Sequence, residues 1–139
     1  MIKFSRREDY AIILVNSLAR EYDKRLVSLT EISQEYNISL FFLRNLANIL
    51  RAHGLIRAVE GKTGGYTLTK DPDIIKMGEI LKIFSNEDQL TCCSESDTHK
   101  RICPQKKNCV AGNTWRQLNK EFLDKVYTLT LIEFMTYKQ

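Results

Sequence analysis

The strongest constraint on the fold of this chain is a pair of adjacent helix signals near its middle. Ser28 and Glu31 have the spacing of a capping box, in which the serine accepts from a first-turn amide and the glutamate reaches back. Ser39 is the expected N-cap of the next helix, and Gly54 supplies the left-handed position at the end of that helix. The sequence therefore predicts a short helix and a longer one, over about residues 40–53, around a tight turn. This is the helix-turn-helix pattern.

A β-hairpin is predicted directly after the longer helix. The β-prone runs 55–59 and 66–69 flank a linker, residues 60–65, whose three glycines suit a hairpin turn. A hairpin that follows a recognition helix is a wing. A further helix is predicted before this unit, over about residues 4–20, and another after it. The apolar residues of the later helix are Ile74, Ile75, Ile80, Leu81 and Phe84.

A long helix is predicted at the end of the chain, with Asn113 as a possible cap. A second capping box, Thr130 and Glu133, indicates that this helix breaks and restarts. A long terminal helix in such a chain pairs with its two-fold mate, because a palindromic operator needs a symmetric reader. The alternative is a helix folded back on its own domain. The apolar stripe of the helix comprises Trp115, Leu118, Phe122, Val126 and Leu129.

These elements predict a mainly α chain with a small β-hairpin, divided into three parts. The parts are a winged helix-turn-helix DNA-binding domain (1–85), a cysteine-bearing loop (86–112) and a dimerisation helix with its tail (113–139). No run approaches the length of a membrane span and the charged start is no signal peptide, so a cytoplasmic protein is expected. The sequence shows no nucleophile–base set, phosphate loop or pair of catalytic carboxylates, so an enzyme is not expected.

Basic charge is concentrated in the predicted helix-turn-helix and wing. The formal net charge of the chain is +4, too small by itself to indicate a nucleic-acid partner. Residues 39–70, however, hold many basic side chains against one acid: Arg44, Arg51, Arg57, Lys62 and Lys70 against Glu60. Lys3, Arg6 and Arg7 add positive charge at the start of the chain. This placement fits contacts to DNA phosphates.

A helical wheel of residues 40–53 separates an apolar face from a polar one. The inward positions are Phe42, Leu43, Leu46, Ile49 and Leu50, and the outward positions are Phe41, Arg44, Asn45 and Asn48. Arginine and asparagine pair with guanine and adenine edges in the major groove of double-stranded DNA. The alternatives are a solvated helix face and an ordinary hairpin. The predicted DNA-binding residues are Lys3, Arg6, Ser39, Phe41, Arg44, Asn45, Asn48, Arg57 and Lys62.

All the cysteines of the chain fall within residues 92–109: Cys92, Cys93, Cys103 and Cys109. Thiolates are the ligands that select iron–sulfur clusters, zinc or copper. The spacing from Cys103 to Cys109 is wider than the Cys-x2-Cys of structural zinc sites and fits a larger body such as an iron–sulfur cluster. A reactive disulfide pair and a zinc site remain alternatives.

Several segments resemble the bacterial winged-helix transcription regulators that include IscR and NsrR. These segments are 3–11, 27–39, 43–56, the wing motif Gly-Lys-Thr-Gly-Gly-Tyr-Thr-Leu at 61–68, Met-Gly-Glu-Ile at 77–80 and Trp-Arg-Gln-Leu at 115–118. The likeness covers nearly the whole chain. It implies a homodimer with a winged helix-turn-helix, a long dimerisation helix and, in many members, an iron–sulfur cluster of the [4Fe-4S] or [2Fe-2S] type.

The resemblance also implies a ligand set. The family's three-cysteine motif falls on Cys93, Cys103 and Cys109, with Cys92 as the alternative to Cys93. IscR-like members place a histidine three residues beyond the last cysteine, where this chain has Gly112. NsrR-like members take a carboxylate from the first helix, and the matching position is Asp9. The ligand set is therefore expected to be closer to that of NsrR.

The chain departs from the family pattern in three further places. The spacing from Cys93 to Cys103 is longer than usual. Glu60 stands in the wing where members often have arginine, which moves the expected groove contact to Lys62. Arg44 stands where relatives carry Glu or Gln, so a different operator is expected.

The resulting hypothesis is a dimeric transcriptional repressor whose operator affinity is controlled by an iron–sulfur cluster that senses nitric oxide, redox or iron–sulfur status. The alternative is a regulator of the same fold that works as a metal-free thiol/disulfide switch or responds to a metabolite.

Overall fold

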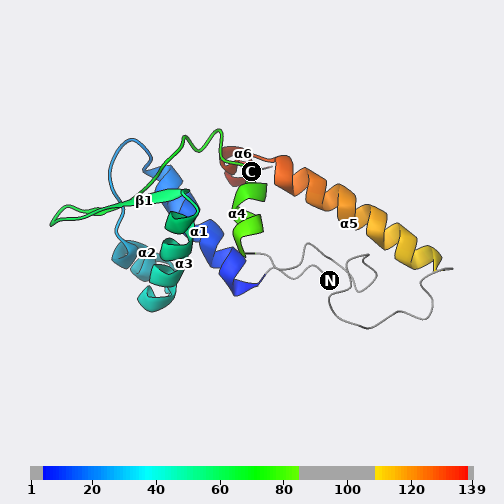
Figure 1. Cartoon of the computed structure of the whole chain (residues 1–139), viewed down its shortest axis with the longest axis horizontal. Coiled ribbons are helices and arrows are strands. Elements are labelled where there is room, and N and C mark those ends of the chain that lie inside the picture. The colour runs from blue at the N-terminus through cyan, green and yellow to red at the C-terminus, as the bar shows by residue number, and fades with distance from the viewer. Residues whose placement is uncertain (1–4, 85–108, 138–139) are drawn as a thin grey trace.

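The computed structural model describes residues 5–84 and 109–137 of the chain. Its described part is mainly helical, with one small antiparallel sheet, as predicted. In chain order the elements are α1 (Arg6–Arg20), α2 (Leu29–Tyr36), α3 (Leu40–Ala52), β1 (Ile56–Val59), β2 (Gly65–Leu68), α4 (Met77–Phe84), α5 (Val110–Thr128) and α6 (Leu131–Met135). Figure 1 shows α5 as a long helix that leaves the remaining elements, on the side opposite to the hairpin.

The predicted capping box starts α2. The Ser28 N–H donates to the Glu31 carboxylate at 2.8 Å, and the Glu31 N–H donates to the Ser28 hydroxyl at 3.1 Å. The backbone donor at Ser28 and the side chain of Arg25 together hold the pKa of Glu31 below its usual value. Asn37 ends α2 in the left-handed region, at φ 52°, which turns the chain directly into α3.

One part of the turn differs from the prediction. Ser39 occupies the N-cap position of α3, but its side chain makes no capping hydrogen bond. Its backbone carbonyl still accepts from the Leu43 N–H at 3.0 Å, which begins the helix. Ser39 is exposed, so water can satisfy the remaining first-turn groups in place of the hydroxyl.

The core is formed mainly by α1, α2 and α3, and buried residues of the hairpin, α4 and α6 join the same cluster. On α3, Leu43, Leu46 and Leu50 are at most 1% exposed, as the wheel predicts. Full burial of a leucine side chain contributes about 1.5–3 kcal/mol. Tyr10 on α1 and Phe42 on α3 pack edge to face with their ring centroids 5.5 Å apart. The apolar face of α3 is therefore packed directly against α1.

The predicted hairpin forms, and a third segment joins it. Arg57 pairs with Thr67 in the β1–β2 register. The backbones of Val27 and Tyr66 exchange hydrogen bonds of 3.0 and 2.8 Å, which ties the base of the wing to the chain before α2. A Cβ on Gly65 would lie 2.8 Å from the Val27 carbonyl oxygen, so only glycine fits this crossing.

The last helices differ from the prediction at two boundaries. Ile74 lies before α4 and is 62% exposed, whereas Ile75, also before α4, is fully buried. The prediction that Asn113 caps the long helix is wrong, because α5 begins at Val110 and Cys109 is its N-cap. The second capping box is confirmed: the Thr130 N–H donates to Glu133 at 2.8 Å at the start of α6.

Candidate nucleic-acid interface and cysteine site

The outer face of α3 presents the side chains that the wheel predicts. Phe41 is 73% exposed, and Arg44, Asn45 and Asn48 are also exposed. At this exposure the Phe41 ring is largely open to solvent, and the polar groups beside it are donors and acceptors that suit base edges. This face can therefore enter a major groove without first breaking internal contacts.

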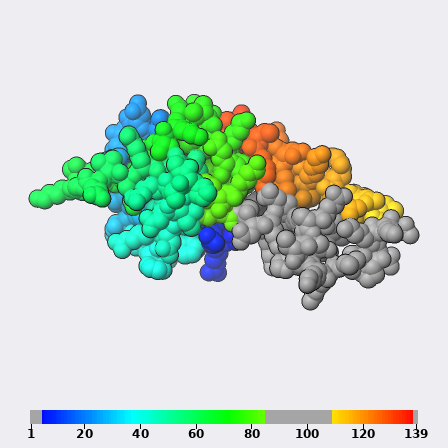
Figure 2. Space-filling view, in the orientation of Figure 1, coloured from blue at the N-terminus to red at the C-terminus, as the bar shows by residue number. Residues whose placement is uncertain are grey.

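The wing carries its basic residues on exposed positions at the same end of the molecule as α3. Arg57 lies on β1 and Lys62 in the hairpin turn, and both are exposed. Figure 2 shows the hairpin projecting from the molecule as a thin arm. Arg6 is exposed as well, but it starts α1 at the end of that helix away from the hairpin (Figure 1). Lys3 lies outside the described residues.

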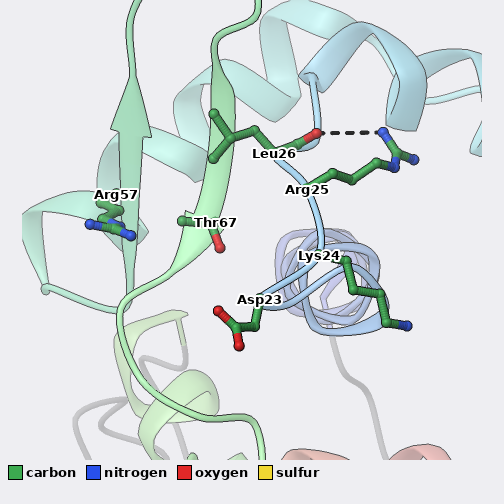
Figure 3. Close-up of a pocket in the computed structure, with 6 residues that line it drawn as sticks. All are labelled: Asp23, Lys24, Arg25, Leu26, Arg57 and Thr67. Carbon is green, nitrogen blue, oxygen red and sulfur yellow. Dashed lines mark hydrogen bonds between the residues drawn. The ribbon is translucent and has the colours of Figure 1, made fainter.

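A shallow pocket of about 200 Å³ lies at the base of the wing, between the hairpin and the chain that follows α1. It is lined by Asp23, Lys24, Arg25, Leu26, Arg57 and Thr67. Figure 3 shows Arg25 turned toward the Leu26 carbonyl, a contact of 3.4 Å. Arg25 also pairs with Glu31 at 2.9 Å, so its charge is engaged within the domain. The sequence offered no signal for this pocket, because the Val27–Tyr66 bridge brings its two sides together.

Cys109 has a defined position at the start of α5. Its thiol is free and half-buried, and its sulfur accepts a hydrogen bond of 3.2 Å from the Gly112 N–H. Cys92, Cys93 and Cys103 lie outside the described residues. Within residues 5–84 and 109–137, no three His, Cys, Asp or Glu side chains gather into a group that could hold a metal ion.

Asp9 and Glu8 differ in environment although they are neighbours on α1. Glu8 is only 7% exposed, and its carboxylate accepts from the Ser5 N–H in a capping box that begins the helix. Asp9 is exposed to solvent in the same turn. The Arg7 guanidinium lies over the Phe84 ring, 6.0 Å from its centroid. The first turn of α1 is thus next to the end of α4, after which the chain continues toward the cysteines.

The free end of α5 exposes large apolar side chains. Val110 is 79% exposed, Trp115 55% and Leu118 48%, whereas the stripe residues Phe122 and Val126 nearer the domain are half-buried. Among the described residues, no helix is long and apolar enough to cross a membrane. Within the described part of the chain, the exposed Val110, Trp115 and Leu118 therefore form an apolar surface on an otherwise polar helix.

Comparison with known protein families shows to which family this chain belongs. The sequence model of the family Rrf2, described as "Iron-dependent Transcriptional regulator", matches residues 4–137. The chain belongs to the Rrf2 family. The regulator IscR of Vibrio vulnificus is 30% identical over 135 residues, which cover 97% of this chain and 78% of that protein.

Solved structures confirm the winged-helix architecture of this Rrf2 chain. The cysteine regulator CymR of B. subtilis has a TM-score of 0.78 at 24% identity, and the match covers 100% of both chains. The oxidised form of Staphylococcus aureus CymR has a TM-score of 0.76 at 28% identity, and the match covers 99% of both chains. Because Rrf2 relatives are DNA-binding transcription regulators, this chain is one too and is not an enzyme.

Proposed function

We propose that this chain is a cytoplasmic homodimeric repressor of a palindromic operator, and that an iron–sulfur cluster responsive to nitric oxide, redox or iron–sulfur status controls its DNA affinity. The position of Cys109 carries the proposal. Its sulfur caps the helix whose opposite end joins the winged domain, so a change at this thiol acts on one end of a rigid connector. The relationship to IscR and the iron-dependent description of the family support the same assignment.

The residues that would hold the cluster are three thiolates and one carboxylate: Cys93 (or Cys92), Cys103, Cys109 and Asp9. Cys109 fits this role, because its sulfur is unbridged and already accepts from a backbone N–H. Such hydrogen bonds to a ligating sulfur tune the potential of a cluster. Asp9 fits because its carboxylate is exposed, unlike that of Glu8. When bound, the cluster supplies a centre that reacts with nitric oxide or oxidants. This carboxylate-containing set makes the chain closer to NsrR.

Only a few packed residues separate Asp9 from the proposed DNA-reading face of α3. Asp9 precedes Tyr10, whose ring packs against Phe42 on α3 with a centroid separation of 5.5 Å. Phe42 is adjacent to Phe41 on the exposed reading face of the same helix. A shift of the first turn of α1 would therefore displace the recognition helix through a packed aromatic pair, the kind of contiguous contact that carries coupling.

The dimer is proposed to form through the exposed apolar end of α5. Trp115 and Leu118 lie on one stripe and are about half exposed, which leaves a patch that a second copy of the chain can cover. Two-fold symmetry then presents two α3 helices to a palindromic operator. We assign base contacts to Ser39, Phe41, Arg44, Asn45 and Asn48, and phosphate or minor-groove contacts to Lys3, Arg6, Arg57 and Lys62.

Arg44→Ala is expected to weaken binding to the preferred operator by about 1–3 kcal/mol and to relax the base preference at one position. Lys62→Ala should instead weaken binding to all DNA sequences and flatten the dependence of affinity on salt. Gel-shift titrations over a range of salt concentrations distinguish the two effects. Arg20→Gln is the matched control, since the Arg20 guanidinium is paired with Glu35 at 2.9 Å. Unchanged affinity in both test variants would exclude this surface as the reader.

The central experiment is anaerobic purification of the full chain, followed by an absorption spectrum and analysis of iron and acid-labile sulfide. We expect a coloured protein that binds a DNA operator, obtained by selection from random duplexes, and that loses affinity after addition of nitric oxide. A colourless protein with stoichiometric zinc would contradict the cluster assignment and leave the DNA-binding fold untouched.

The second candidate is a metal-free thiol switch. It is favoured by the likeness to S. aureus CymR, which was solved in an oxidised form. It predicts that iron-free protein binds the operator, that peroxide changes the affinity, and that dithiothreitol restores it. A metabolite-responsive repressor of the same fold would respond to neither reagent.

A further inference from the structure

The corner between α5 and α6 is built into the winged domain. The Met77 N–H donates to the Leu129 carbonyl at 2.8 Å, and the Leu131 N–H donates to the Ile75 carbonyl at 2.8 Å. Ile75, Met77 and Leu131 are all 0% exposed. This pair of backbone hydrogen bonds around the Lys76–Thr130 bridge fixes the C-terminal end of α5 to the start of α4.

Just before this corner, α4 and α5 approach each other at Gly78. A Cβ on Gly78 would lie 3.0 Å from both the Cβ and the carbonyl oxygen of Tyr127. The Lys82 ammonium lies 5.6 Å from the centroid of the Tyr127 ring and is one helical turn beyond Gly78 on α4. Tyr127 is therefore held against α4 by two contacts: close packing on Gly78 and a cation–π contact with Lys82.

Because α5 is long, a small change of its angle at Tyr127 displaces the start of the helix by several ångströms. Trp115 lies twelve positions before Tyr127, which is about 18 Å along a helix with a rise of 1.5 Å per residue. A tilt of about 10° at Tyr127 would move Trp115 by about 3 Å on this helix geometry. That displacement is close to the rise of B-DNA, about 3.4 Å per base pair. A small change in the crossing angle therefore moves the proposed dimer surface, relative to the winged domain, by a distance comparable to one base-pair step.

We propose that the Gly78–Tyr127 contact is the pivot that sets the angle between the winged domain and α5, and thereby the half-site spacing that the dimer accepts. Gly78, Tyr127 and Lys82 are positioning residues in this role, since none is on the reading face of α3 or on the wing. The inference rests on the proposed dimerisation through α5 and goes beyond it, because it assigns operator spacing to residues remote from DNA.

The test begins with a half-site that the wild-type full chain selects from random duplexes. Palindromes of that half-site are then prepared with spacers lengthened or shortened one base pair at a time. Binding of each palindrome and of the isolated half-site is titrated, and the dimer is monitored by sedimentation. The variants are Gly78→Ala, Lys82→Gln and Tyr127→Leu. Glu79→Ala is the matched control, because Glu79 is exposed on the same helix and its carboxylate pairs with the exposed Lys70 at 3.3 Å.

Gly78→Ala is expected to shift the preferred spacer, or to lower affinity for the original palindrome by at least about tenfold, with half-site affinity unchanged. Helix propensity alone would favour alanine at this position, so such a result identifies the contact with Tyr127 as its cause. Lys82→Gln and Tyr127→Leu both keep the close approach of the helices at Gly78 but remove the cation–π contact. They should therefore broaden the range of spacers that the dimer accepts. These two variants decide the question if Gly78→Ala does not fold.

A wild-type spacing profile in the folded Gly78→Ala dimer would overturn the pivot, as would unchanged profiles in both ring variants. A wild-type chain that does not dimerise, or that shows no spacing preference, would overturn the proposed dimeric reader and the pivot with it. The two failures are distinguishable because only the second is visible in the unmutated protein.

Discussion

Anaerobically prepared Cys109→Ala protein is expected to be colourless, with iron and acid-labile sulfide at background level. Removal of one thiolate leaves only two thiolates in the proposed set, and iron–sulfur clusters are held mainly by thiolates, so the cluster should not assemble. The same loss is expected for Cys103→Ala. Of Cys92→Ala and Cys93→Ala, only one should lose the chromophore. The measurements are the absorption spectrum and metal analysis of protein kept under anaerobic conditions.

Cys109→Ser separates ligation from helix capping. The Cys109 sulfur accepts the Gly112 N–H at 3.2 Å, and a serine hydroxyl can accept the same donor. This variant should therefore lose the cluster while α5 keeps its first turn, as read by helical circular dichroism. The alanine variant should also lose the cap, at a cost of about 0.5–2 kcal/mol if it is worth as much as an ordinary one. A coloured Cys109→Ala protein with full iron content would exclude Cys109 as a ligand.

The sequence was sufficient for the fold because most of its signals are local. The Ser28–Glu31 box forms as predicted, since both hydrogen bonds join residues three positions apart. The buried positions of α3 follow from helical period alone, and Leu43, Leu46 and Leu50 are buried accordingly. The hairpin could be predicted for the same reason, because its glycines and β-prone runs are contiguous in the chain.

The start of α5 was predicted less well. Asn113 is a better N-cap by residue preference than a cysteine, so the sequence favoured a later start. In the structure Asn113 belongs to the first turn, where its N–H donates to the Cys109 carbonyl at 3.2 Å, and the thiol caps the helix instead. Cys109, a proposed cluster ligand, therefore also has a structural role that its residue type does not predict.

Contacts between distant segments lay beyond sequence reasoning altogether. Gly78 and Tyr127 meet because backbone hydrogen bonds join the start of α4 to the end of α5, and no periodicity encodes that pairing. The different environments of Glu8 and Asp9 likewise depend on how α1 packs in the fold, which the sequence alone does not show. Of the proposed cluster thiols only Cys109 lies within the described residues, and the assignment of all of them as ligands stays a prediction.

The assignment of Asp9 as the fourth ligand leads to a second large expected effect. Asp9→Ala protein should still assemble a cluster on its three thiolates, but the lifetime of that cluster in air or chelator should fall by at least about tenfold. Because Asp9 adjoins Tyr10, which packs against Phe42, ligation would connect the cluster to the recognition helix. The variant should therefore respond weakly to nitric oxide in an operator-binding titration. Loss of absorbance over time and affinity before and after nitric oxide are the measurements.

Two matched variants separate ligation from the helix-stabilising roles of these carboxylates. Asp9→Asn keeps the size of the side chain and should be as defective as Asp9→Ala, because the charged oxygen is lost in both. Glu8→Gln keeps a side chain that can accept from the Ser5 N–H in the capping box, so its cluster lifetime should match that of the wild type. His99, which lies between Cys93 and Cys103 in the sequence, is the other candidate ligand. The contrary pattern would be normal lifetime and nitric-oxide response in Asp9→Ala, with both destroyed in Glu8→Gln or His99→Ala. That pattern would move the fourth ligand from Asp9 to Glu8 or His99, and it would remove the direct connection through Tyr10 to α3.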